Sequence, residues 1–142
     1  MKKIMMIGRT GCGKTTLTQV LQNEKIDYKK TQAIEFFDNA IDTPGEYIEN
    51  VRFYNALIVS AADCDLIALL QSSIDEQCVF PPGFACSFAK PAIGIITKCD
   101  LAKKEDDLVR AKEFLKETGV EKIYTISSLQ NHGINDIVKL LE

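Results

Sequence analysis

The sequence of 142 residues has no tryptophan, one histidine (His132) and only four prolines. Its five cysteines form no Cys-x-x-Cys pair and are odd in number, which argues against a zinc site and against a disulfide framework. The 17 lysines and arginines are outnumbered by 20 acidic residues, so the net charge is −3 and the basic excess typical of proteins that coat nucleic acids or membrane surfaces is missing. No apolar run approaches the ~20 residues of a transmembrane helix. We therefore expect no nucleic-acid partner and no membrane partner.

The remaining composition is that of an ordinary folded protein. Hydrophobic residues make up 46% of the chain and charged residues 26%, which excludes a disordered chain. The apolar run at residues 4–7 is shorter than the ~7–15 residues of a secretory signal, so we expect a cytoplasmic protein with reduced thiols. The length predicts one domain over residues 1–142.

Short apolar runs alternate along the chain with segments of helical spacing. The runs predict strands at residues 4–7, 32–37, 66–70, 92–96 and 123–126. The helical spacing predicts helices at residues 15–23, 47–62, 105–118 and 134–141, and residues 81–88 are expected to hold a loop with one short helix. This alternation is typical of an α/β fold with three layers, in which helices cover both faces of a mostly parallel sheet. Ligands of such sheets bind at the carboxyl ends of the strands.

Residues 8–15 read Gly-Arg-Thr-Gly-Cys-Gly-Lys-Thr and match the P-loop pattern GxxxxGK[ST]. The match lies between a predicted strand and a predicted helix, which is the context that the motif requires. Its glycines let successive N–H groups point at one anion, and the helix adds its positive N-terminal end. Lys14 can then contact the β- and γ-phosphates, and the Thr15 hydroxyl can bind Mg²⁺. The alternative is a glycine turn that matches by chance.

Two further segments are candidates for the metal and the γ-phosphate. In the run Asp-Thr-Pro-Gly at residues 42–45, Asp42 can hold Mg²⁺ through a water, and Gly45 lets its N–H approach the γ-phosphate. Taken alone, this run is an ordinary turn. Thr31, within the polar residues 29–32, either closes on Mg²⁺ and the γ-phosphate or belongs to a solvated basic loop. The predicted metal ligands are Thr15, Thr31 and Asp42.

A predicted strand ends in Thr-Lys-Cys-Asp at residues 97–100, which is suited to binding a purine base. The Asp100 carboxylate can accept hydrogen bonds from the N1 and N2 donors of guanine, whereas adenine has no donor at N1. The stem of Lys98 can lie along the base, and Ser127 and Ser128 can offer a backbone N–H to the base oxygen. The alternative for Asp100 is the N-cap of a helix. The predicted nucleotide-binding residues are Gly8, Arg9, Thr10, Gly11, Cys12, Gly13, Lys14, Thr15, Thr16, Gly45, Thr97, Lys98, Asp100, Ser127 and Ser128.

In this order the motifs resemble those of Ras-like small GTPases over nearly the whole chain. The runs Lys-Thr-Gln-Ala-Ile-Glu-Phe (residues 30–36) and Ile-Asp-Thr-Pro-Gly-Glu-Tyr (residues 41–47) resemble the ethanolamine-utilisation EutP and propanediol-utilisation PduV family. The resemblance implies a cytoplasmic P-loop NTPase linked to bacterial microcompartments, with a shell protein or an enzyme as a possible partner. It also implies acetate kinase activity as an alternative, because that activity has been attributed to the EutP branch.

The chain departs from the small-GTPase pattern in three places, one of which is Thr10, a residue that stands where such proteins usually carry a small one and can crowd the γ-phosphate. Asp42 follows Thr31 by only eleven residues, so the second and third strands must be very short. Glu46 stands where such proteins carry a water-orienting glutamine, and it can act as a base or repel the phosphates. The predicted catalytic residues are Lys14, Thr31 and Glu46. We expect binding and slow hydrolysis of GTP (or ATP) with Mg²⁺; the alternatives are ATP-dependent phosphoryl transfer to acetate and a nucleotide-binding scaffold with negligible turnover.

Overall fold

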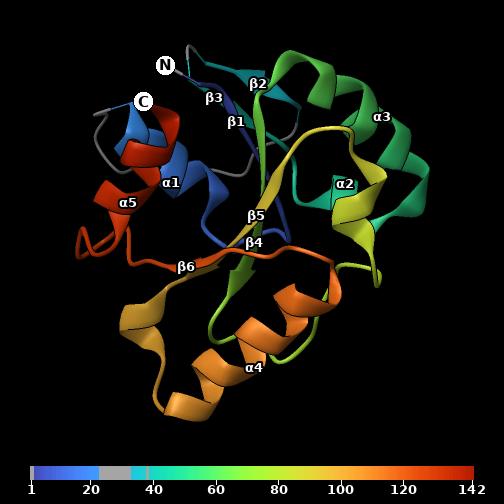
Figure 1. Cartoon of the computed structure of the whole chain (residues 1–142). Helices are drawn as coiled ribbons and strands as arrows, with labels where there is room; N and C mark the ends of the chain where they lie inside the picture. The colour runs from blue at the N-terminus through green and yellow to red at the C-terminus, as the bar shows by residue number, and fades with distance from the viewer. Residues whose placement is uncertain (1, 23–32, 38) are drawn as a thin grey trace.

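The computed structural model describes residues 2–22, 33–37 and 39–142, which form a six-stranded sheet with the order β2-β3-β1-β4-β5-β6 (Figure 1). The strands are β1 (Ile4–Gly8), β2 (Glu35–Phe36), β3 (Ala40–Asp42), β4 (Leu66–Ser72), β5 (Ala92–Thr97) and β6 (Ile123–Thr125). All neighbouring strands are parallel except β2 and β3, which are antiparallel. The mostly parallel α/β sheet and the short second and third strands are as the sequence predicts.

Helices cover both faces of this sheet. The α-helices are α1 (Lys14–Leu21), α2 (Glu46–Glu49), α3 (Tyr54–Ser60), α4 (Glu105–Glu117) and α5 (Ile134–Leu141). The short 3-10 segments are η1 (Val51–Phe53), η2 (Ala61–Asp63), η3 (Phe84–Ser87) and η4 (Cys99–Leu101). Figure 1 shows α1 and α5 on one side of the sheet and α2 and α3 on the other.

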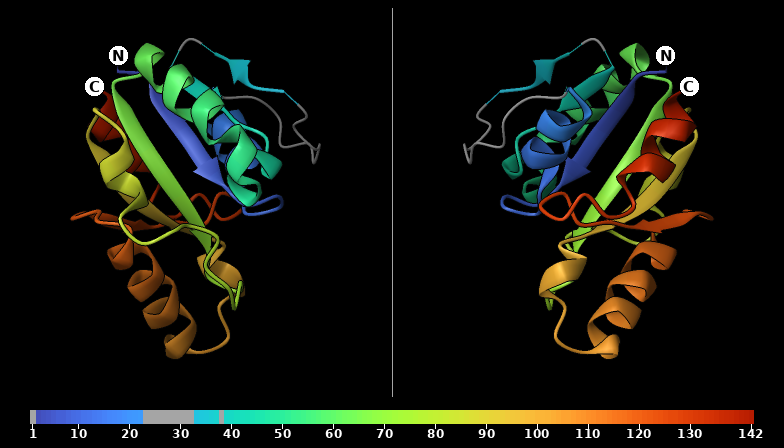
Figure 2. Two further views of the ribbon diagram at one scale, coloured as in Figure 1. Left: turned by 90° about the vertical axis from the view of Figure 1, so that its right-hand side faces the viewer. Right: turned by 90° about the vertical axis from the view of Figure 1, so that its left-hand side faces the viewer.

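Two buried clusters, one on each face, hold the layers together. Side chains of a strand alternate between faces, so Ile4 and Met6 of β1 belong to the cluster that includes residues of α1 and α5, while Met5 and Ile7 belong to the cluster that includes residues of α3 and α4. All five residues of β1 are buried, which explains why this strand reads as a continuous apolar run. The two ends of the chain lie close together (Figure 2), and the backbone N–H of Lys2 donates to the carbonyl of Leu141 at 2.6 Å.

One predicted element is wrong. Instead of a continuous helix over residues 47–62, α2 ends at Glu49 and α3 begins at Tyr54. Asn50 between them is extended, with φ −132° and ψ 120°, and its side-chain oxygen accepts from the backbone N–H of Arg52 at 3.2 Å. Asparagine side chains compete with the helical backbone in this way and favour caps.

The other predicted elements are present with shifted ends. The helix predicted to reach residue 23 ends at Leu21, and the strand predicted over residues 32–37 is reduced to β2 within its described part. The strand predicted over residues 66–70 continues to Ser72, and the short helix expected before residue 88 is η3. Within the described part of the chain, no helix combines the length and the hydropathy needed to cross a bilayer.

Candidate functional site

A tight loop at residues 8–15 joins β1 to α1. Gly11 and Gly13 adopt φ angles of +81° and +108°, which side-chain-bearing residues rarely reach, and Lys14 is the first residue of α1. The Lys14 side chain is buried, and its Nζ donates to the carbonyl of Arg9 at 3.0 Å across the loop. The first turn of α1 contains no acidic residue. The loop therefore combines a helix N-terminus with one ammonium group, an arrangement suited to an anion.

Cys12 fills the space behind this loop rather than adding reactivity. A Cβ on Gly8 would lie 2.5 Å from Cys12 Sγ and 2.8 Å from the carbonyl oxygen of Leu70, so only glycine lets the loop pack onto β4. Burial raises the pKa of the Cys12 thiol, and the nearby Lys14 ammonium opposes this more weakly. The thiol therefore stays protonated at neutral pH and adds no negative charge beside Lys14.

Beside the loop, a hydroxyl and a carboxylate are in direct contact. Thr15 Oγ1 donates to Asp42 Oδ2 at 2.7 Å, and Asp42 is 1% exposed at the carboxyl end of β3. Thr43 fixes the chain after β3, because its hydroxyl donates to the carbonyl of Met6 at 2.7 Å. Hydroxyl and carboxylate oxygens are ligands that Mg²⁺ accepts, so these two residues fit the ion. The third predicted ligand, Thr31, lies outside the described residues.

Among the described residues, no group of three or more His, Cys, Asp or Glu side chains could hold a metal ion. Mg²⁺ is commonly held by one or two protein oxygens, with waters and substrate phosphates completing its octahedron. Thr15 and Asp42 are therefore a sufficient protein contribution only if a phosphate ligand binds at the neighbouring loop.

The segment at residues 42–45 lies directly against the glycine-rich loop. A Cβ on Gly45 would lie 2.1 Å from the backbone nitrogen of Thr10 and 2.2 Å from Thr10 Oγ1. The sequence predicts a glycine here for close approach to a phosphate, and in the structure the close approach is to Thr10. Glu46 follows as the exposed first residue of α2.

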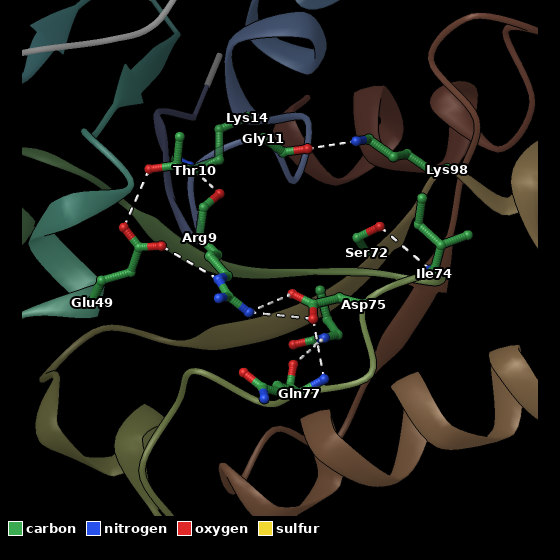
Figure 3. Close-up of polar contacts among 11 residues, drawn as sticks. Arg9, Thr10, Gly11, Lys14, Glu49, Ser72, Ile74, Asp75, Gln77 and Lys98 are labelled. Atoms are coloured by element: carbon green, nitrogen blue, oxygen red, sulfur yellow. Dashed lines mark hydrogen bonds and ion pairs between the residues drawn. The ribbon is translucent and has the colours of Figure 1, made fainter.

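Two side chains after β5 tie this strand to the glycine-rich loop. The Thr97 hydroxyl donates to the carbonyl of Cys12. The Lys98 ammonium donates to the carbonyl of Gly11 (Figure 3). Lys98 has φ +58°, a left-handed conformation that is uncommon for lysine, and this turn carries the chain from β5 into η4. The two contacts join the P-loop motif and the Thr-Lys-Cys-Asp motif into one site, although they are far apart in the sequence.

Asp100 lies in η4 and accepts a hydrogen bond from Ser127 Oγ on Oδ1 at 2.8 Å. It does not cap the next α-helix, because the N-cap of α4 is Lys104. The backbone N–H of Ser127 donates to the carbonyl of His132 at 3.0 Å, and its side chain orients Asp100. Of the two serines predicted to offer a backbone N–H to the base, Ser128 lines the neighbouring cleft. A cleft beside Asp100 is lined by Gly13, Thr16, Thr97, Lys98, Asp100, Leu101, Ser128 and Leu129.

Several residues at this site are not predicted by the sequence. Glu49 of α2 and Asp75 in the loop after β4 both contact the side chain of Arg9 (Figure 3). Leu101 and Leu129 add apolar walls to the cleft. No motif marks these residues, because they are brought to the site by the fold and not by a fixed spacing from the glycine-rich loop.

A family model described as "Ethanolamine utilisation - propanediol utilisation" (PduV-EutP) matches residues 1–142. The chain belongs to the PduV-EutP family. Its relatives include the "Propanediol utilization protein PduV" of Citrobacter freundii, with 42% identity over 96% of this chain and 91% of the relative. The "Probable acetate kinase EutP" of Escherichia coli (strain K12) is 35% identical over 99% of this chain and 89% of the relative. The predicted family is therefore confirmed.

Solved structures share the architecture of this PduV-EutP chain. The crystal structure of an Aquifex aeolicus Era variant bound to GDP.AlF4⁻ matches with a TM-score of 0.69 and 19% identity. The match covers 99% of this chain and 56% of the Era chain, so the chain spans about half of that protein. At this identity the likeness shows the fold, which is the P-loop NTPase fold that the motifs predict.

Proposed function

We propose that the chain binds a purine nucleoside triphosphate, GTP before ATP, together with Mg²⁺, and hydrolyses it slowly. The observation that carries this proposal is the meeting of three motifs at the carboxyl ends of β1, β3 and β5. Lys14, the Thr15–Asp42 pair and Asp100 come from these three segments, and the contacts of Thr97 and Lys98 join them. The Era structure, bound to GDP and AlF4⁻, supports a guanine nucleotide in a protein of this fold.

Each part of the site has a distinct task in this proposal. Backbone N–H groups of residues 8–15 and the N-terminus of α1 bind phosphate oxygens, and Lys14 adds a full positive charge that is already desolvated. Thr15 and Asp42 hold Mg²⁺, which when bound supplies positive charge to the phosphates. Asp100, oriented by Ser127, accepts from the base edge. Thr31 is proposed to close on the γ-phosphate.

Hydrolysis is proposed to be slow because, among the residues that the structure describes, little besides Lys14 is placed to stabilise the developing charge. Glu46 replaces a neutral water-orienting amide with an anion. The three arginines have other partners: Arg9 contacts Glu49 and Asp75, Arg52 lies over the ring of Phe53, and Arg110 contacts Asp107 and the carbonyl of Ser73. Each guanidinium group would have to leave these contacts before it could act as an arginine finger.

We expect γ-phosphate release from GTP at about 10⁻⁴–10⁻² s⁻¹, the range of GTPases without an activating partner. The measurement is single-turnover release of inorganic phosphate from the isolated chain with Mg²⁺. Release faster than about 1 s⁻¹ would refute the proposed slow hydrolysis. A chain without bound Mg²⁺, prepared with a chelator, is the matched blank.

The relative named "Probable acetate kinase EutP" favours a second candidate, phosphoryl transfer from ATP to acetate. In that reaction the acetate oxygen attacks the γ-phosphorus, the bond to the β-phosphate oxygen breaks, and acetyl phosphate and ADP form. Phosphate released to water at the same rate with and without acetate supports the GTPase. Acetyl phosphate formed only with acetate supports the kinase, and tight binding with negligible turnover supports a scaffold.

The family's link to ethanolamine and propanediol utilisation supports one more proposal, a setting and a partner. We place the chain in the cytoplasm, in association with a bacterial microcompartment. The proposed partner is a shell protein or an enzyme of that compartment.

A further inference from the structure

Glu49 of α2 is attached to the outer edge of the glycine-rich loop by two contacts (Figure 3). Its Oε2 accepts from Thr10 Oγ1 at 3.2 Å, and its Oε1 lies 3.3 Å from Arg9 Nε. Both partners are successive residues of the loop, so one carboxylate bridges them. The contacts fasten α2, the helix that follows Gly45, onto the proposed phosphate site.

Arg9 is itself held in place from the opposite side. Its Nη1 lies 3.3 Å from both carboxylate oxygens of Asp75, and Asp75 Oδ1 accepts from the backbone N–H of Gln77 at 3.1 Å. The guanidinium therefore sits between two carboxylates, which keeps it turned away from the ring of N–H groups in the loop. Asp75 and Arg9 thus position Glu49 and keep its charge partly neutralised next to Thr10.

The close approach of Gly45 to Thr10 leaves no room where the third phosphoryl group is proposed to sit. Gly45 is the residue whose N–H is proposed to meet the γ-phosphate, yet a Cβ on Gly45 would lie 2.1 Å from Thr10 N. Since even a single added carbon atom would overlap Thr10, the space between the two residues cannot admit a phosphoryl group. The Glu49 carboxylate, which accepts a hydrogen bond from Thr10, also places a negative charge beside the position proposed for the negatively charged γ-phosphate.

We propose that Glu49 is a specificity-determining residue, which makes the site favour a nucleoside diphosphate over a triphosphate by latching α2 onto Thr10. This inference rests on the proposed nucleotide site and deepens it. A triphosphate binds only when Gly45 withdraws from Thr10, and this withdrawal breaks the Thr10–Glu49 hydrogen bond. Because α2 is short and is bounded by Gly45 and the extended Asn50, it can shift without unwinding a long helix. A diphosphate needs no such shift.

Two substitutions break the latch and keep the net charge. Glu49→Asp shortens the side chain by one methylene, and Thr10→Val removes the hydroxyl. The matched control is Glu113→Asp, which makes the same chemical change at an exposed position of α4. Calorimetric titration with Mg²⁺ and either GDP or guanylyl imidodiphosphate gives the ratio of the two dissociation constants for each protein. Thermal unfolding followed by circular dichroism confirms that each variant is folded.

We expect each latch variant to shift the ratio toward the triphosphate analogue by about two- to fivefold, the range of exposed charged contacts. The affinity of the Glu49→Asp variant for GDP stays unchanged, and so does the ratio of dissociation constants of the Glu113→Asp control. The double variant shifts the ratio no further than Glu49→Asp alone, because Glu49→Asp already removes the contact with Thr10. If both single variants bind GDP but keep the ratio of dissociation constants of the unsubstituted chain, the proposed latch is wrong and the proposed nucleotide site is unaffected. If the unsubstituted chain binds neither nucleotide, the proposed function itself fails and the latch falls with it.

Discussion

Replacing Lys14 by methionine is expected to weaken binding of the GTP analogue by about 100-fold or more, because removal of one partner of a buried charge pair costs about 2–5 kcal/mol. The Lys14 ammonium is 5% exposed and is held above the loop by the Arg9 carbonyl. Folding has therefore already removed most of the water around this ammonium group, so phosphate binding requires little further desolvation of the charge. Methionine keeps the unbranched stem but has no charge. Calorimetric titration with Mg²⁺ measures the change.

The stability of this variant separates binding from folding. A buried ammonium is costly to desolvate, so Lys14→Met is expected to leave the free energy of unfolding within about 1 kcal/mol of the original or to raise it. Lys112→Met, at an exposed position of α4, is the matched control and should leave both stability and binding unchanged. A folded Lys14→Met protein that binds the analogue with full affinity would show that phosphate does not contact this ammonium.

Replacing Asp100 by alanine is expected to remove the preference for guanine. The carboxylate is oriented by Ser127 Oγ at 2.8 Å and borders the cleft, so it is placed to accept two hydrogen bonds from a guanine edge. A site built to hydrogen-bond one ligand can reject an analogue by ~10⁴ in favourable cases, and we expect a loss of about 100-fold in GTP affinity here because the cleft is partly open. Affinity for ATP should stay within about threefold, since adenine offers no N1 donor to this carboxylate.

This prediction is tested by titration of both proteins with GTP and ATP analogues. Asp63→Ala, an exposed substitution in η2, removes the same charge far from the cleft and serves as the control. Equal affinities of the unsubstituted chain for the two analogues would remove guanine from the proposal and leave a general nucleoside triphosphate site.

The parts of the site that the sequence predicts are those whose physics is local. Gly11 and Gly13 adopt left-handed backbone inside the loop, and this need for glycine is visible in the sequence as the P-loop pattern. Strand β1 is buried on both faces, and this burial is visible as a continuous apolar run. The same holds for the carboxyl ends of β3 and β5, where a strand ends in polar residues. Parallel pairing then brings Asp42 to Thr15, as expected for neighbouring strand ends.

What the sequence does not predict depends on tertiary contacts. The apolar stripe over residues 47–62 predicts one helix, but the backbone of Asn50 is extended where α2 ends, and its side chain caps the following segment η1. The pairing of Arg9 with Glu49 and Asp75 joins residues 40 and 66 positions apart, and no periodicity records such a contact. Ser127 likewise follows a strand as many serines do, and only the fold places its hydroxyl on Asp100.

In the proposed function, the backbone amides of residues 8–15 and the ammonium group of Lys14 form a phosphate site. It is tested most directly by titrating the full chain, saturated with Mg²⁺, with a non-hydrolysable GTP analogue in a calorimeter. We expect saturable binding of one nucleotide per chain, with a dissociation constant well below millimolar and loss of the heat signal in Lys14→Met. A folded chain that takes up neither a guanine nor an adenine triphosphate at millimolar concentration would contradict it.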